Sequence, residues 1–297
     1  MTEVTSAIRA TFAAAGAVGH LHVREIGTNY EVGLGADDAV VLASVFKVPV
    51  AVAFEREVSA GRLEPTDRTV VTDRYKTGGV GTAGCQDDVE MSWRDLAHLM
   101  LTLSDNAATD LIYHRVGQGA IDTVLADVGL ANTRVVGSCE DILISMGNEL
   151  GAEWRSPEFD ALVSSLAPER VKTLAVLDPQ QASSSTAREM TTLLEAIWTN
   201  RAAPGDACQR IRTTMTQQIW PHRLTAGFGQ DVRVAGKTGT LPGIRNEVGV
   251  VTYPDEKSYA VAVFTRCESI ELNLPDVDRS IGRAARIGIE SLRDHST

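Results

Sequence analysis

Ser44 and Lys47 stand three residues apart at the start of the apolar run Val45 to Phe54. This run predicts a buried helix, and residues i and i+3 share a helix face, so the Lys47 amine can reach the Ser44 hydroxyl. A serine hydroxyl becomes a good nucleophile only when a base removes its proton. A lysine among apolar neighbours can be that base, because burial disfavours its charged form and lowers its pKa. The pair alone proves little, since Ser-x-x-Lys arises about once by chance in a chain of this size.

Two further motifs give this pair its significance. Ser104-Asp105-Asn106 follows the amphipathic run Met91 to Leu103, and Lys237-Thr238-Gly239 lies within the run Val234 to Thr240. The three motifs, in this order, are those of class A β-lactamases and penicillin-binding proteins. The chain therefore resembles the class A β-lactamase family and its penicillin-binding-protein relatives. The resemblance covers most of the chain.

The resemblance implies a role for each residue that takes part in acylation. Ser44 is expected to be the nucleophile that becomes acylated, with Lys47 as its base and hydrogen-bonding partner. Ser104 is expected to pass a proton to the leaving nitrogen, because a hydroxyl both donates and accepts hydrogen bonds. Asn106 matches the position that holds the side-chain amide of the substrate, or alternatively caps or ties helices. The backbone N–H groups of Ser44 and Thr240 are expected to form the oxyanion hole.

The resemblance also implies a side of the cleft that binds a carboxylate. Lys237 is expected to supply positive charge that attracts a substrate carboxylate and, through repulsion between like charges, to keep Lys47 neutral. Thr238 and Thr240 can donate hydroxyl hydrogen bonds to the same carboxylate. Arg245 is either a second carboxylate contact or a surface arginine. The expected partner is thus a small molecule that bears a carboxylate.

The sequence departs from the family where a deacylating base is expected. Class A enzymes carry a Glu-x-x-Leu-Asn loop, and that motif is absent from this sequence. Residues 129–134 resemble the approach to the loop and residues 183–190 resemble the segment after it, but the connection is roughly 30 residues longer than expected, a length that suits a lid. Glu140 is nearest in register to the missing base and Glu169 is the next candidate; each is otherwise an ordinary solvated glutamate.

Strand patterns occur near both ends of the chain. Residues 19–27 and 30–34 alternate like two strands, and β-rich segments recur at residues 232–237, 247–253 and 259–265. Between them the chain reads as mainly helical. The simplest arrangement is an α/β fold of the α+β type, in which helices flank one antiparallel sheet built from both termini. We expect a sheet domain of residues 1–37 and 225–297, an inserted all-helical domain of residues 38–224, and the active site between them.

Composition limits the partners of the protein. The chain has 297 residues, a net charge of -11 and a pI near 5.1, which argues against nucleic acid or an anionic membrane as partner. The N-terminal residues lack the pattern of a signal peptide, and no apolar run is long enough to span a membrane. The cysteines, at positions 85, 139, 208 and 267, form no Cys-x-x-Cys pair. We therefore expect free thiols in the cytoplasm and no metal or organic cofactor, although a mature secreted form with a start methionine has the same appearance.

These observations predict a serine acyl hydrolase that attacks a lactam, amide or ester through an acyl-Ser44 intermediate. One alternative is an intracellular peptidase or transacylase in biosynthesis. Another is a non-catalytic sensor that recognises penicillin and is acylated without turnover. A scaffold without activity is disfavoured, because every residue expected for acylation is present.

Overall fold

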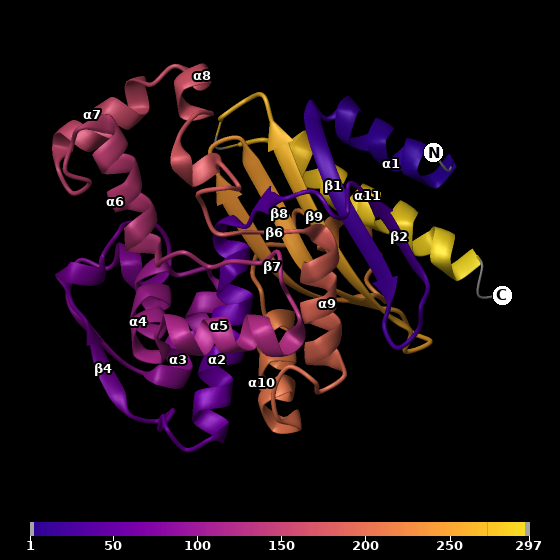
Figure 1. Cartoon of the computed structure of the whole chain (residues 1–297), viewed down its shortest axis with the longest axis horizontal. Coiled ribbons are helices and arrows are strands. Elements are labelled where there is room, and N and C mark those ends of the chain that lie inside the picture. Colours follow the sequence, from indigo (N-terminus) through magenta and orange to yellow (C-terminus); the bar gives the residue numbers. More distant parts are fainter. Residues whose placement is uncertain (1–2, 272, 295–297) are drawn as a thin grey trace.

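A single antiparallel sheet joins the two ends of the chain (Figure 1). The computed structural model describes residues 3–271 and 273–294. The sheet has five strands in the order β2-β1-β9-β8-β7. Their bounds are β1 (Ala17–Glu25), β2 (Glu31–Leu34), β7 (Arg233–Leu241), β8 (Ile244–Thr252) and β9 (Ser258–Cys267). The predicted α+β fold, with a sheet built from both termini, is confirmed.

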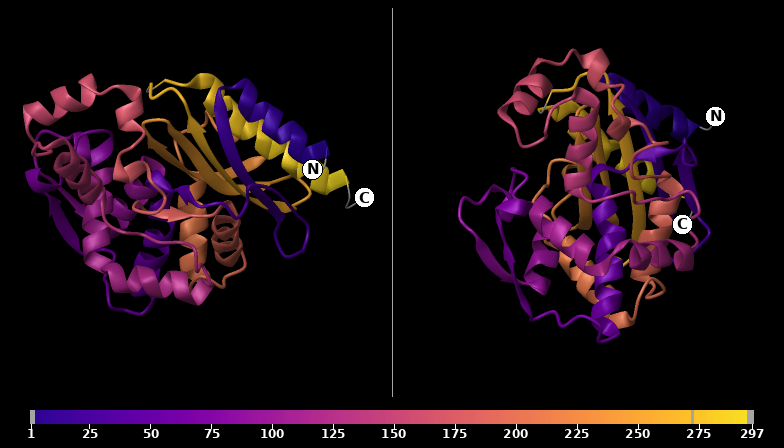
Figure 2. Two further views of the ribbon diagram at one scale, coloured as in Figure 1. Left: turned by 45° about the horizontal axis from the view of Figure 1, so that its top comes forward. Right: turned by 60° about the vertical axis from the view of Figure 1, so that its left-hand side comes forward.

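The sheet is buried on both faces, and alternate residues of β9 show why. Val261 and Val263 pack with α1 (Glu3–Ala14) and α11 (Pro275–Asp294) on one face. Ala262 and Phe264 point to the opposite face and join the main core with α9 (Ala187–Trp198). Successive side chains of a strand point to opposite faces, so a strand covered on both sides is apolar throughout. Figure 2 shows α1 and α11 lying side by side on the outer face of the sheet.

The helical region surrounds α2 (Lys47–Ser59), whose residues from Lys47 to Phe54 are all buried. The predicted helix beginning at Ser44 begins instead with a 3₁₀ turn, η1 (Ala43–Phe46), and Pro49 falls in the first turn of α2, where its missing N–H costs no helical hydrogen bond. Ser92 caps α3 by accepting the Asp95 backbone N–H. The helices around α2 are α3 (Trp93–Thr102), α4 (Asn106–Val116), α5 (Gln118–Val128) and α10 (Gly205–Thr216).

The segment between residues 38 and 224 is not purely helical. It contains two antiparallel strand pairs, β4 (Arg68–Val71) with β5 (Val89–Ser92) and β3 (Val40–Val41) with β6 (Ser184–Ser185). Its helix α9 also packs against β1 and β9 of the sheet. The long connection before β6 forms an arm at the upper left of Figure 1. The arm consists of α6 (Cys139–Leu150), α7 (Pro157–Ser165), α8 (Pro168–Val171) and the turn η4 (Ala175–Leu177).

No helix within the described ranges combines the length and the apolar character needed to cross a membrane. The remaining short turns are η2 (Asp73–Tyr75), η3 (Gly81–Gly84) and η5 (Thr225–Gly227).

Candidate active site

Ser44 lies on the turn η1, which packs against the edge strand β7. The first residue of the turn, Ala43, has a φ of 47°, a left-handed backbone conformation that is uncommon for residues other than glycine. β7 passes the turn at Gly239, where an added Cβ would lie 2.6 Å from the Leu42 carbonyl oxygen. Glycine therefore allows the backbones of β7 and η1 to approach closely. This approach suits the oxyanion donors predicted at Ser44 and Thr240, which remain a prediction.

The amine of Lys47 joins the motifs of α2 and α4. It donates to the Ser104 carbonyl oxygen at 2.7 Å and to the Asn106 Oδ1 at 2.8 Å, and it lies 3.2 Å from the Ser104 Oγ. Ser44 is not among its hydrogen-bond partners in the described structure, so the predicted direct contact between Lys47 and Ser44 is replaced by a contact with Ser104. A neutral amine can satisfy all three contacts by donating twice and accepting from the Ser104 hydroxyl.

The turn between α3 and α4 is held by Asp105. This buried carboxylate accepts from the Thr82 N–H at 2.5 Å, from the Thr82 hydroxyl at 2.7 Å and from the Ala108 N–H at 3.1 Å. It thus caps α4 and ties the loop around Thr82 to the site. Ser104, just before it, has a φ of 67°. Strain of this kind persists only where the surroundings enforce it, and here they fix the Ser104 hydroxyl beside Lys47.

Two buried lysines make the electrostatics of the site unusual. Burial lowers the pKa of Lys47, and the neighbouring thiol and carboxylates of Cys139, Asp110 and Asp105 oppose this only in part. The pKa of Lys237 is lowered well below its ordinary value, first by burial and then by the charge of Lys47. Both shifts favour a neutral amine, and a neutral Lys47 is the form that can accept a proton.

A cavity of about 610 Å³ opens beside Ser44, and we call it the Ser44 cavity. It brings together groups from the helical region and from β7. Its lining residues are Ser44, Gly79, Val80, Leu103, Ser104, Asn106, Trp220, His222, Arg223, Thr238 and Thr240. Of the predicted site residues, five therefore share one cavity. None of these described lining residues is an aspartate or a glutamate.

Arg223 is the functional candidate that the sequence did not reveal. Its guanidinium donates to the Thr240 hydroxyl at 2.8 Å and to the Gly239 and Asn246 carbonyl oxygens, and it pairs with Asp278 at 2.7 Å. The side chain thus stands where Arg245 was expected. No motif marks the loop that contains Arg223, and its partner Asp278 lies far along the chain.

Arg245 lies elsewhere. It is buried, and its guanidinium donates to the backbone carbonyl oxygens of Leu241, Ile244 and Glu271. These contacts tie the end of β7 to the segment after β9 and match neither alternative, because the residue is neither in the Ser44 cavity nor on the surface.

Glu140 and Glu169 also lie outside the Ser44 cavity. The Glu140 carboxylate faces Arg155 at 3.7 Å, and Glu169 is exposed on α8. The side chain that reaches the site from this segment is Cys139, whose Sγ lies 3.3 Å from the Asn106 Oδ1. Burial raises the pKa of this thiol to about 12, so it is neutral at ordinary pH.

The position of Cys139 follows from the way α6 docks on α4. The Asp110 carboxylate accepts from the backbone N–H groups of Cys139 at 2.6 Å and of Glu140 at 3.0 Å. These are the first N–H groups of α6, which have no partner within the helix, and a carboxylate there is favourable. Asp110 therefore directs the start of α6 toward Lys47 and sends Glu140 away from it.

The whole chain matches a known family. The description of that family is the Beta-lactamase enzyme family, and the match spans residues 3–292. The chain belongs to this family, which confirms the resemblance inferred from the three motifs. Among curated proteins, it is similar to the Beta-lactamase regulatory protein BlaB of Streptomyces cacaoi, with 26% identity over an alignment of 293 residues that covers 94% of each protein.

Solved structures share the fold. A β-lactamase from Sphaerobacter thermophilus is 24% identical with a TM-score of 0.76, over 97% of this chain and 96% of that one. PBP-A is 19% identical with a TM-score of 0.77, over 99% and 97% of the two chains. At these identities the likeness concerns the fold.

Proposed function

We propose that Ser44 is acylated by carboxylate-bearing lactams, and by amides or esters of similar shape, and that the acyl group is released slowly. The Ser44 oxygen attacks the carbonyl carbon while Lys47 takes its proton, and the N–H groups of Ser44 and Thr240 stabilise the oxyanion. The carbonyl carbon then separates from the leaving nitrogen, which receives the Ser104 hydroxyl proton. Lys47 returns its proton to Ser104 across the 3.2 Å contact, so the protons balance.

One observation carries this proposal: Ser44 and Ser104 line one cavity, Lys47 contacts its lining residues Ser104 and Asn106, and none of the described lining residues is a carboxylate. Hydrolysis of an acyl-enzyme needs a water activated by a base within hydrogen-bond reach. From the arm, the Cys139 thiol contacts Asn106 of the cavity lining, and it cannot act as a base while it is protonated. Acylation is therefore favoured over deacylation.

The carboxylate preference rests on the groups across the cleft from Ser104. Thr238 and Thr240 present hydroxyls to the Ser44 cavity, and the Arg223 guanidinium holds the Thr240 hydroxyl. Lys237 lies beneath them with its amine bonded to the Thr238 carbonyl oxygen at 2.9 Å. An incoming carboxylate supplies the negative charge that stabilises the protonated form of this buried amine.

A second candidate function is that of a sensor that stays acylated. The absence of a carboxylate from the described lining of the Ser44 cavity favours this role, and the similar protein from Streptomyces cacaoi is named a regulatory protein. In such a protein the long-lived acyl-Ser44 is itself the signal, and the arm that packs near the site is the element able to respond.

Intact-mass analysis after exposure to penicillin G tests the proposal. We expect one adduct of the mass of the whole antibiotic, mapped to Ser44 by peptide digestion and absent from Ser44→Ala. An adduct on Ser104 or on a cysteine contradicts the assignment. Adding an amine acceptor separates the remaining alternatives, because a transacylase loses its adduct faster in its presence whereas a sensor does not.

A further inference from the structure

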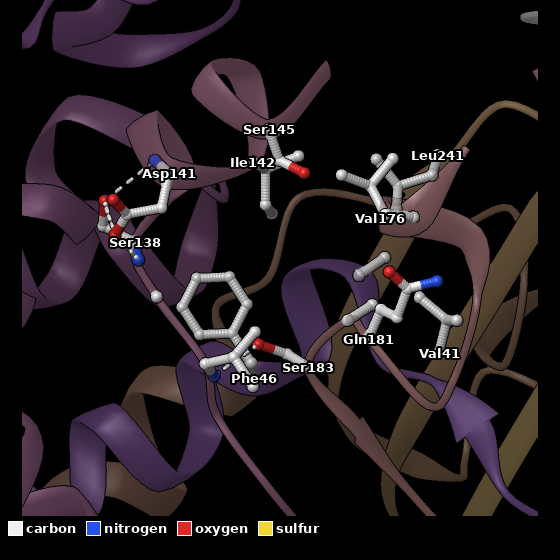
Figure 3. Close-up of a pocket in the computed structure, with 15 residues that line it drawn as sticks. Val41, Phe46, Ser138, Asp141, Ile142, Ser145, Val176, Gln181, Ser183 and Leu241 are labelled. Carbon is white, nitrogen blue, oxygen red and sulfur yellow. Dashed lines mark hydrogen bonds between the residues drawn. The ribbon is translucent and has the colours of Figure 1, made fainter. Parts of the chain in front are cut away.

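A second cavity lies behind the nucleophile turn, and we call it the rear cavity. Its volume is about 280 Å³, and its walls include Ala43 and Phe46 of η1, Leu241 of β7 and Ile142 of α6. Figure 3 shows its labelled side chains converging from these elements and from η4. The lining residues of the rear cavity and of the Ser44 cavity do not overlap.

The two cavities lie on opposite sides of the contact between η1 and β7. On η1, Ser44 lines the Ser44 cavity and its neighbour Ala43 lines the rear cavity. On β7, Thr240 lines the Ser44 cavity and its neighbour Leu241 lines the rear cavity. The backbone groups between the cavities include the two predicted oxyanion donors. A molecule in the rear cavity therefore packs directly against the residues beside those donors.

The lining of the rear cavity selects for an uncharged ligand. Most of it is aliphatic or aromatic, and none of its described residues is lysine, arginine or histidine. Its carboxylate, Asp141, is already engaged as the capping partner of Ser138, with the Ser138 N–H 2.7 Å away. An anion would enter without a counter-charge, and burial of an unpaired charge is strongly unfavourable.

Polar groups at the rim can orient such a ligand. The Ser145 hydroxyl and the Gln181 amide both border the cavity from different elements (Figure 3). Apolar walls with a few convergent polar groups are typical of small-molecule sites, and about 300 Å³ is the lower end of their usual volume.

We propose that the rear cavity binds a small, uncharged, mainly apolar molecule with one hydrogen-bonding group, and that its occupancy raises the rate at which Ser44 is acylated. A void beside a turn forfeits the packing contacts that would hold the turn in place. A ligand restores those contacts against Ala43 and Phe46, so the left-handed Ala43 and the adjacent Ser44 N–H are held more firmly. The rate effect rests on the proposed acylation of Ser44, but binding does not.

Two fluorescent probes with the same ring system test the binding. N-phenyl-1-naphthylamine is uncharged, whereas 8-anilino-1-naphthalenesulfonate is anionic. We expect the uncharged probe to bind at micromolar concentration and Ser145→Phe, which fills the cavity, to weaken it at least tenfold. The matched control is Ile144→Phe on the adjacent, exposed position of α6, which should bind as the parent does. Ala175→Leu, from the opposite wall, repeats the test if Ser145→Phe does not fold.

Each outcome bears on the proposal. Protein acylated beforehand with penicillin G should still bind the uncharged probe, and unmodified protein with the probe bound should be acylated at least threefold faster. Loss of probe binding on acylation would show that the space belongs to the acyl group of the substrate, which overturns a separate site. Equal weakening by both phenylalanine variants, or an unchanged acylation rate with the probe bound, also overturns the proposal. If Ser44 is never acylated, the binding result stands by itself and identifies the proposed function as the part that failed.

Discussion

Lys47 and Lys237 are buried close enough for the charge of one to lower the pKa of the other. Both come from motifs that the sequence displays, yet the sequence cannot show that both are 0% exposed. In the free protein each is biased toward its neutral form. A substrate carboxylate changes this balance, because it favours protonation of Lys237 while repulsion between the lysines keeps Lys47 neutral. The substrate carboxylate thus helps to keep Lys237 protonated and Lys47 neutral.

Replacement of Lys237 tests this assignment. We expect Lys237→Ala to slow acylation by a carboxylate-bearing penicillin roughly ten- to a hundredfold, the equivalent of one charge-assisted hydrogen bond of about 1.5–3 kcal/mol. The methyl ester of the same penicillin should be affected far less. Rates measured by mass spectrometry for both compounds decide the matter, and equal losses contradict the carboxylate role.

Glu140 and Glu169 provide a second test. Because neither lines the Ser44 cavity, Glu140→Gln and Glu169→Gln should release the acyl group within about twofold of the parent rate, a spread well under 1 kcal/mol. The release rate is followed by loss of the adduct after free penicillin is removed. A hundredfold slowing in either variant would reveal a base that the arm brings into the site.

Sequence reasoning found the site residues that lie in motifs and missed those that depend on tertiary packing. Arg223 reaches Thr240 only because its other partner, Asp278, is on α11. Cys139 reaches Asn106 because Asp110 holds the start of α6. Neither of these contacts is marked by a local pattern in the sequence. Arg245 was expected from the resemblance, but backbone carbonyl oxygens of Leu241, Ile244 and Glu271 hold its guanidinium outside the Ser44 cavity.

At the level of elements, the approach of η1 to β7 positions the nucleophile. Gly239→Ala should force these elements apart, since the new Cβ would meet the Leu42 carbonyl oxygen at 2.6 Å. We expect acylation to fall at least a hundredfold, the scale seen when one oxyanion donor is lost. Gly205→Ala, whose new Cβ has its nearest neighbour at 3.7 Å, is the control and should acylate normally. A normal rate in Gly239→Ala would show that the contact is unimportant.

Most elements were predictable because their patterns are local. The Ser92 cap, the amphipathic α9 and the β-rich strands of the sheet carry clear signals. The turn at Ala43 was not predictable, because a positive φ at alanine is enforced by packing against β7 rather than by its own propensity. The short pair β3 and β6 likewise forms only because the arm returns the chain beside the turn.

At the level of the whole molecule, the site forms where the sheet meets the helical region. Lys47 comes from α2 and Lys237 from β7, so folding buries two amines at one boundary. A lysine whose folded pKa lies below its ordinary value of 10.5 binds fewer protons in the folded chain than in the unfolded chain. Between those two pKa values, stability therefore rises with pH. At pH values below the folded pKa, the lysine is charged in both the folded and the unfolded chain. The full free-energy cost of burying that charge then lowers the stability of the protein.

This linkage predicts a difference between the parent and Lys237→Met. Methionine has no charge to bury, so the variant should be the more stable protein near neutral pH. The advantage should shrink as pH rises toward 10.5, because the unfolded parent also loses its Lys237 proton there and folding no longer has to remove it. Urea unfolding at several pH values measures the free energies. An advantage that stays constant or grows with pH contradicts the lowered pKa of Lys237.

The central claim is that Ser44 acylates readily and deacylates slowly. Rapid mixing with an excess of penicillin G, followed by time-resolved intact mass, measures both steps in one experiment. We predict that a single adduct accumulates to about one equivalent in a fast phase and persists through many times that interval once free penicillin is removed. Rapid loss of penicillin in a linear steady state, with no adduct accumulating at any time, would contradict the account.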